Sequence, residues 1–347
     1  MPTTRMPLPT PRGRLSAGLA RRLTDDLARC DDLVAEATAV GADGILVDDD
    51  VQLALLMLYE LHYRGIEGVD DGWEWHPGLL AVRAALEAPF EAALLAGAPI
   101  IELRPAGVAE SLFSATAPQP DRGRSLAGYL ARSGTVANYR DFLTVRSVYH
   151  LKEADPHTWA IPRLAGAAKA ALVEVQADEY GGGRPDRMHA TLFADSMAAL
   201  GLDCRYGMLV DEAPAVVLAG VNAMSMFGLH RRLVGAVVGH LAAFEMTSSL
   251  PNRLYGNGLR RLGFGVQATR FFDEHVQADA VHEQIAGRDL AGGLAEQDPA
   301  QAPQILFGAA ACLYLDDLAA QHLLTHFRSG TSPRHRGAQL AGARAAS

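Results

Sequence analysis

The chain of 347 residues is long enough to bury a sizeable hydrophobic core, in one large domain or in one domain with a smaller companion. Hydrophobic residues make up 49% of it and charged residues 20%, an ordinary globular composition. The net charge of -9, without a long basic run before the very end, argues against a nucleic-acid partner. Three cysteines without a Cys-x-x-Cys pair indicate neither a disulfide framework nor a zinc ribbon, and they fit a reducing cytoplasm.

The two ends of the chain are predicted to be disordered. Residues 1–14 are rich in Pro, Thr and Arg and lead into no apolar core of signal-peptide type, and residues 329–347 contain Pro, Arg, Gly and Ala. The apolar runs Leu53 to Leu58 and Leu233 to Phe244 are too short to span a membrane. We therefore expect a soluble cytoplasmic protein without a membrane partner.

Residues 15–103 predict an N-terminal helical region. Val51 to Tyr63 is strongly apolar, and Leu79 to Leu95 has helical spacing with Pro89 as a break inside it. Three prolines and two glycines among polar residues then predict a linker at 104–124.

Residues 125–328 predict a second helical region. No segment alternates apolar and polar residues over several strands, so the fold class is all-α. The expected helices are Tyr139 to Lys152, Ile161 to Glu179, Asp186 to Leu200, Pro214 to Phe227, Leu229 to Leu250, Phe271 to Ile285 and Gln304 to Phe327.

A glycine triplet separates two of these helices. Glu179 stands in the last turn of one helix, and His189 in the first turn of the next, for which Asp186 is the expected N-cap. A tight corner at Gly181–Gly183 could bring Glu179 and His189 to one point. A phosphate loop is not indicated, because no strand precedes the glycines and no Gly-Lys-Ser/Thr follows them.

The stretch from Phe271 to Ile285 carries the most informative spacing in the chain. His275, Asp279 and His282 stand at i, i+4 and i+7, so a helix presents all three on one stripe. Imidazole and carboxylate ligands without thiolate favour iron or manganese over structural zinc. The alternative interpretation is a solvated polar face, or histidines satisfied within the core.

Glu245 lies within an apolar run, between Phe244 and Met246. An ionised carboxylate in such surroundings needs a cation or a strong donor, and the alternatives to a metal are Arg253 or Arg260. In the N-terminal region Glu60, His62 and His76 are ligands by residue type alone. Their spacing gives no single face, so packing or an interface is the preferred interpretation.

In chain order the candidates are Glu179, His189, Glu245, His275, Asp279 and His282. This order, with its His-x3-Asp-x2-His motif, resembles the haem-oxygenase-like diiron oxidases, or iron-containing redox enzymes, over about residues 125–327. The resemblance implies a bundle of about seven core helices, often dimeric, in which these six residues hold two Fe ions. Whether Asp178 or Glu179 is the first ligand stays open, with Glu179 favoured.

The resemblance further implies an oxidoreductase, a non-haem diiron oxygenase or oxidase using O2 on an amino acid or amine in specialised metabolism. N-oxygenation or oxidative C–C cleavage would be its chemistry, and an electron donor a possible partner. Alternatives are a fatty-acid oxidative decarboxylase of the same family, a metal-free thiaminase-type enzyme and a non-catalytic metal-binding protein. Arg146 is one basic residue able to bind a substrate carboxylate, unless it is a surface charge, and Phe244 and Tyr255 are expected near the pocket.

Overall fold

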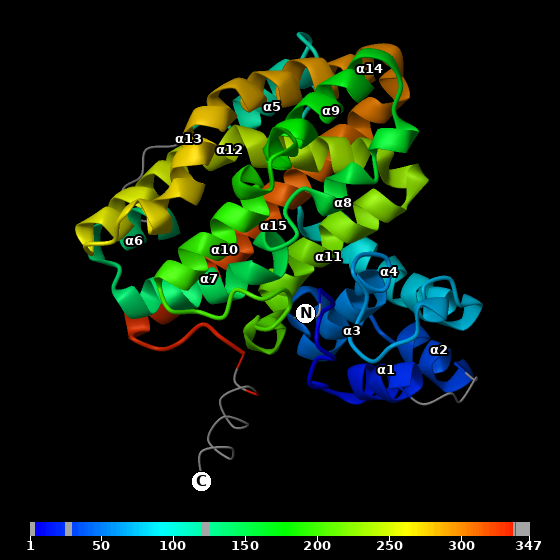
Figure 1. Ribbon diagram of the computed structural model, residues 1–347. Helices are drawn as coiled ribbons and strands as arrows, with labels where there is room; N and C mark the ends of the chain where they lie inside the picture. Colours follow the sequence, from blue (N-terminus) through cyan, green and yellow to red (C-terminus); the bar gives the residue numbers. More distant parts are fainter. Residues whose placement is uncertain (1–3, 25–29, 119–124, 336, 338–347) are drawn as a thin grey trace.

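The computed structural model describes residues 4–24, 30–118, 125–335 and 337, and the backbone but not the side chains of residues 278–280. Helices form every layer of the molecule, and no β-strand occurs within these ranges (Figure 1). The predicted all-α fold is confirmed. The α-helices are α1 (Arg14–Thr24), α2 (Asp31–Thr38), α3 (Asp49–Glu60), α4 (Pro77–Gly97), α5 (Val108–Ala115), α6 (Leu126–Ser133), α7 (Val136–His150), α8 (Asp155–Thr158), α9 (Gly166–Glu179), α10 (His189–Ala199), α11 (Ala215–Leu229), α12 (Val234–Arg261), α13 (Val266–Gln284), α14 (Gly293–Gln297) and α15 (Ala302–Ser329).

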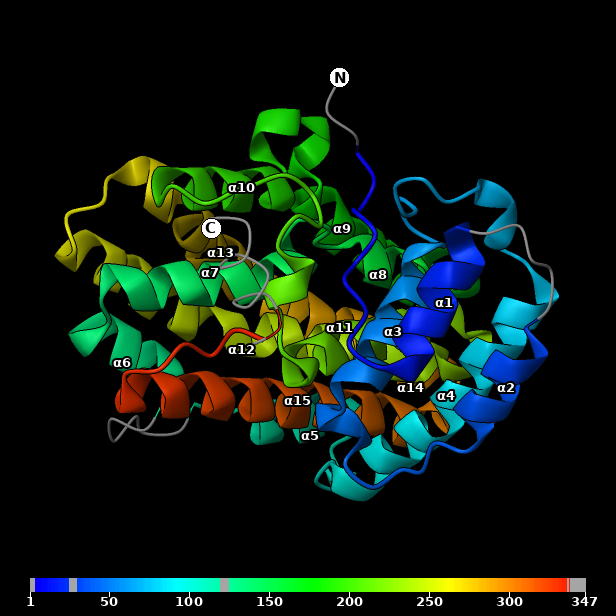
Figure 2. The ribbon, with the colours of Figure 1, turned by 90° about the horizontal axis from the view of Figure 1, so that it is seen from below.

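Helices α1 to α4 gather at one end of the molecule, beside α8 and α11, in both ribbon views (Figures 1 and 2). Their buried apolar residues join those of the bundle in one continuous core. Buried polar contacts cross the boundary: Asn222 of α11 donates to the Gln52 side chain of α3 at 2.8 Å, and Lys152 Nζ lies 3.0 Å from Glu60 Oε2. The N-terminal region therefore packs against the bundle.

Parts of both ends are ordered by contacts that a local sequence pattern does not reveal. Residues 4–13, predicted to be disordered, instead lie along the molecule, with Met6 buried and Thr10 bonded to Asp211. Near the other end Arg334 pairs with Asp141 and Glu212. Residues 1–3, 336 and 338–347 lie outside the described ranges. The predicted linker at 104–124 includes α5, while residues 119–124 are not described.

Two helices continue through prolines, at Pro89 against a predicted break and at Pro251 beyond a predicted helix end. Helix α4 runs on past Pro89, and α12 runs past Pro251 to Arg261 instead of ending at Leu250. A proline removes one hydrogen bond from the helix interior, but buried residues on the following turns, Phe90 in α4 and Tyr255 in α12, hold each helix in the core.

Two other predicted boundaries are wrong. The predicted helix from Ile161 to Glu179 is a 3₁₀ turn at Ile161–Arg163 followed by α9, which begins at Gly166 with φ of +55°. Asp186 does not cap α10, because it lies in a separate 3₁₀ turn, Pro185–Arg187, and α10 begins at His189.

Helix α13 passes into a π-helix, Ile285–Gly292. Other 3₁₀ turns are Ile45–Val47, Asp71–Trp73, Gly181–Gly183, Val210–Glu212, Arg231–Leu233 and Pro299–Gln301.

The stretch Arg231–Arg261, which includes α12, is long and apolar enough to cross a membrane by length and composition alone. Unbroken runs of apolar residues, considered alone, predict no segment long enough to span a membrane. Within the stretch, 61% of the apolar window is buried in the protein, and core helices of soluble proteins pass the same test. Helix α12 packs against α15 and α13, which accounts for its apolar residues.

Helices α12 and α15 approach most closely at two glycines. A Cβ at Gly239 would overlap the Ile305 carbonyl, and a Cβ at Gly308 would overlap the Ala236 carbonyl. Backbone carbonyls cannot rotate away as a side chain tip can. The crossing therefore requires glycine on both helices.

We expect Gly239→Ala to lower the free energy of unfolding by about 1–3 kcal/mol or more, because the added methyl group overpacks this crossing. Gly220→Ala in α11 is the matched control: its Cβ would meet nothing within 4 Å, so a gain of up to about 1 kcal/mol is expected. Urea unfolding of both variants measures the difference. Equal stability of the two variants would contradict the proposed close approach.

Candidate metal centre

The glycine triplet turns the chain sharply between α9 and α10. Gly181, Gly182 and Gly183 have φ of +69°, +60° and +77°, and a Cβ at Gly181 would lie 2.7 Å from the Met188 backbone nitrogen. Residues with a Cβ rarely adopt this conformation. As a result Glu179, at the end of α9, lies with Oε2 2.9 Å from Nδ1 of His189, at the start of α10. The predicted meeting of these two side chains is confirmed.

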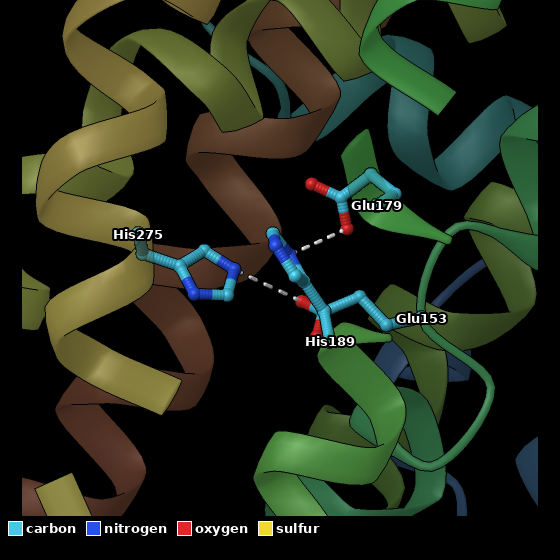
Figure 3. Close-up of side chains that lie close together, drawn as sticks. All are labelled: Glu153, Glu179, His189 and His275. Atoms are coloured by element: carbon cyan, nitrogen blue, oxygen red, sulfur yellow. Dashed lines mark ion pairs between the residues drawn. The ribbon is translucent and has the colours of Figure 1, made fainter. Parts of the chain in front are cut away.

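A first group of four buried residues surrounds this contact. Their ligand atoms all lie within 4.8 Å of one another: Glu153, Glu179, His189 and His275. Figure 3 shows His275 reaching in from α13, with Nε2 3.7 Å from Glu153 Oε1. The rings of His189 and His275 have centroids 4.4 Å apart. The group thus joins α9, α10, α13 and the turn after α7.

Glu153 was not among the sequence candidates. It lies in the turn between α7 and α8, and His150 Nδ1 is 2.8 Å from its Oε1. Ala154, next in the chain, has φ of +75°, uncommon for a residue with a Cβ, and Gln176 of α9 donates to its carbonyl at 3.0 Å. A charged residue beside Asp155-Pro156 suggests an exposed turn, so no local signal reveals this buried carboxylate.

A second group of three buried residues shares one member with the first. Its members are Glu179, Glu245 and His282, with ligand atoms again within 4.8 Å of one another. His282 Nδ1 lies 3.4 Å from Glu245 Oε2. Arg260, an alternative partner for Glu245, pairs with Asp273 instead. Glu179 therefore stands between two sets of potential ligands.

Asp178 and Glu179, the two alternatives for the first ligand, differ in burial and in their neighbours. The Asp178 side chain is 63% exposed and accepts a hydrogen bond from His282 Nε2 at 3.0 Å, whereas Glu179 is buried and belongs to both groups. Asp279 lies on α13 between His275 and His282, but its side chain is outside the described part of the structure.

The ligand-type residues of the N-terminal region have other partners. Glu60 pairs with Lys152 and accepts from Tyr206, and a ring nitrogen of His62 lies 2.6 Å from Arg83. His76 packs against Trp73. Within the described residues none of the three joins a potential metal group, which agrees with the preferred interpretation of packing.

Electrostatics in the metal-free protein show how the buried carboxylates are balanced. Burial would raise the pKa of Glu153, but His150 and His275 lower it well below its ordinary value. Burial would lower the pKa of His282, yet Glu245 and Asp178 raise it to about 9. Burial also raises the pKa of Glu245. Protonated His282 therefore supplies positive charge beside Glu245, where a cation would bind.

Three buried polar atoms in the two groups have no hydrogen-bond partner among the described residues: His189 Nδ1, His282 Nδ1 and Glu153 Oε2. His189 Nδ1 is close to Glu179, but not in hydrogen-bonding geometry. Buried polar atoms without partners are costly, and a cation accepts such lone pairs. His275 is oriented for the same purpose, because Phe271 O lies 2.8 Å from its Nδ1 and leaves Nε2 toward Glu153. The residues fit a metal ion.

The fold and the site together define an all-helical protein with a buried histidine and glutamate centre suited to iron. The chain belongs to the iron-containing redox enzymes, since residues 140–317 match the sequence profile of that family, and its fold is haem-oxygenase-like. It is accordingly an oxidoreductase in the general sense of that family. No curated protein matched the chain.

In the metal-free protein we expect NMR titration to give His282 a pKa above 6.5, near 9. A pKa raised on folding stabilises the folded state fully below about pH 6.5, and this contribution is lost as pH rises through 9. Glu245→Gln should lower the pKa of His282, while Glu296→Gln on the distant helix α14 should not. An unchanged His282 pKa in Glu245→Gln would contradict the pairing.

Proposed function

We propose that the protein is a non-haem diiron oxygenase or oxidase that uses O2 on an amino acid or an amine. The observation that carries the proposal is that Glu179 belongs to both buried ligand groups. A carboxylate has two oxygens and can bridge two cations, and pairs of metal ions in enzymes lie about 3.5–4 Å apart. Separate sites would not need a shared residue.

The assignment of ligands follows from the two groups. One ion would be held by Glu153, Glu179, His189 and His275, and the other by Glu179, Glu245 and His282. Asp279 is proposed as a further ligand because it lies on α13 between the two histidines. When bound, two ferrous ions supply electrons for the reduction of O2.

The chain itself limits what can enter between the two groups. A cavity of about 10 Å³, which we call the carboxylate cavity, is bordered by Glu179, Glu245, His275 and His157. That is close to the space one water needs. Phe244 and Tyr149, whose ring centroids lie 5.5 Å apart, form its wall on one side. A small molecule bound in the carboxylate cavity is shielded from bulk water by this wall.

A second space lies beyond that wall. This apolar cavity, of about 100 Å³, is bordered by Val216, Met224, Leu315 and His240, and also by Phe244 and Tyr149. Arg146 and Asp316, 3.3 Å apart, border the apolar cavity and a neighbouring cavity that reaches Glu153 and His275. A guanidinium and a carboxylate side by side can bind the two charged groups of an amino acid.

The apolar lining favours one second candidate. A fatty acid would place its chain along the valine, methionine and leucine side chains and its carboxylate on Arg146 alone, leaving Asp316 without a role. Oxidative decarboxylation would then be the reaction. The two candidates therefore differ in whether the substrate needs Asp316 as well as Arg146.

Anaerobic titration with Fe(II) should give about two tightly bound ions per chain, and mixing with O2 should consume O2 faster than free iron does. Glu179→Ala should reduce binding at both positions, because it removes the shared ligand. Glu174→Gln, exposed on the same helix, is the matched control and should behave as the wild type. Iron analysis and an oxygen electrode provide the measurements.

Three outcomes would contradict this proposal in different ways. Binding of one ion per chain would refute the shared-ligand arrangement. Two ions without O2 consumption, whatever amine or acid is offered, would indicate a non-catalytic metal-binding protein. Activity that survives Glu179→Ala without iron would indicate a metal-free enzyme of the thiaminase type.

A panel of amino acids, amines and fatty acids should reveal the substrate class. For an amino acid, Arg146→Gln and Asp316→Asn should each raise KM about 10- to 100-fold, since a hydrogen bond to a charged group contributes about 1.5–3 kcal/mol. For a fatty acid only Arg146→Gln should raise KM. Steady-state O2 consumption measures both. No effect from either substitution would place the substrate elsewhere.

A further inference from the structure

Two histidines outside the ligand groups form a buried pair. Nε2 of His157, on α8, lies 3.2 Å from Nδ1 of His240, on α12. His157 is 1% exposed and His240 is 4% exposed. Burial lowers the pKa of His157 to about 4 and that of His240 well below its ordinary value. Both rings are therefore neutral at pH 7, and one hydrogen bond joins them.

Each ring of the pair borders a different cavity. His157 borders the carboxylate cavity, and His240 borders the apolar cavity. The pair uses one nitrogen of each ring, which leaves Nδ1 of His157 and Nε2 of His240. These two nitrogens are the ones that take no part in the contact between the rings. The remaining wall between the cavities is aromatic, formed by Phe244 and Tyr149.

We propose that His157 and His240 relay protons between the apolar cavity and the carboxylate cavity. The proposal rests on the proposed function, because reduction of O2 consumes protons and the aromatic wall restricts water. An imidazole can accept a proton at one nitrogen while it releases another from its second nitrogen. Two such rings in series connect spaces that exchange little water.

The transfer balances for one proton. At the start His240 Nδ1–H donates to His157 Nε2, and His157 carries its own proton on Nδ1. His157 releases that proton into the carboxylate cavity and takes the shared one on Nε2, and His240 Nε2 accepts a new proton from the apolar side. Both rings now carry hydrogen on Nε2, and one proton has passed inward. Each ring then turns about its Cβ–Cγ bond, which restores the first state without returning that proton, so a second proton can follow.

The acidic groups near the histidine pair act on His157, whereas His240 is surrounded by aromatic rings. Glu179 and Glu153 are the acidic groups that act on His157, from α9 and from the turn after α7. His240 is faced by the rings of Phe227 and Phe244 and by His157. A proton on the pair is thus attracted toward the carboxylate cavity.

The first test uses His157→Gln and His240→Gln in the full-length, iron-loaded protein. Glutamine retains a hydrogen bond but cannot pass a proton as imidazole does. We expect kcat for O2 consumption to fall roughly 10- to 100-fold in each variant, with KM and iron content unchanged. The matched control is His322→Gln, from the pair His322 and His326 on α15, whose ring centroids are 4.6 Å apart; it should leave kcat unchanged.

Chemical rescue separates a relay from a structural role. His240→Ala opens a hole beside the apolar cavity, and added imidazole should restore much of its kcat. A purely structural defect would not respond to imidazole while the fold, checked by circular dichroism, is intact. Wild-type kcat in both glutamine variants, or a loss of iron in proportion to the loss of kcat, would overturn the relay.

A measurement without iron keeps the relay testable if the proposed function fails. In iron-free protein labelled with ¹⁵N-histidine, coupling across the His157–His240 hydrogen bond should be visible. Hydrogen exchange at His157 should slow at least about tenfold in His240→Gln, because its route to the apolar cavity is lost. Unchanged exchange at His157 would overturn the relay, whereas absence of O2 consumption in the wild type would overturn only the proposed function.

Discussion

Three buried glutamates, of which Glu179 lies in one ligand group with Glu153 and in the other with Glu245, are the constraint on which the centre of this protein depends. Glu153, Glu179 and Glu245 are each at most 6% exposed, and a buried carboxylate without a partner is strongly unfavourable. Imidazoles from α7, α10 and α13 surround them and offset that cost in the metal-free chain. Because His189 and His282 also belong to the potential ligand groups, the arrangement that preserves the fold is also the one that prepares the metal centre.

The N-terminal region contributes to this centre from outside the bundle. Lys152 precedes Glu153 in the chain, and its ammonium group pairs with Glu60 of α3, both side chains being 1% exposed. Tyr206 donates to the other oxygen of Glu60 at 2.6 Å. Removing either charge would leave the other buried and unpaired, at a cost of about 3–5 kcal/mol. The turn that presents Glu153 is therefore fixed partly by α3, which gives residues 15–103 a structural role in positioning the site.

The sequence was most informative where function imposes a helical spacing. His275 and His282 lie one above the other because α13 is helical, and Glu179 and His189 meet because three glycines allow the corner. Glu153 could not be found in this way, since its place in the site depends on contacts with α9 and α13 that no local pattern contains. The ordered residues 4–13 escaped notice for the same reason: their partners, such as Asp211, are distant in the chain. The ligand roles of the six predicted residues stay predictions.

The turn after α7 shows how few residues build the polar interior. Within Leu151 to Thr158 it supplies Glu153 to the first ligand group and His157 to the carboxylate cavity, with Ala154 between them in the left-handed region. That conformation costs roughly 1–2 kcal/mol for a residue with a Cβ, so surrounding contacts must maintain it. Gln176 of α9 does so by donating to Ala154 O and Thr158 Oγ1. Gln176 lies one turn before Glu179, so a single helix positions both the shared carboxylate and the turn that faces it.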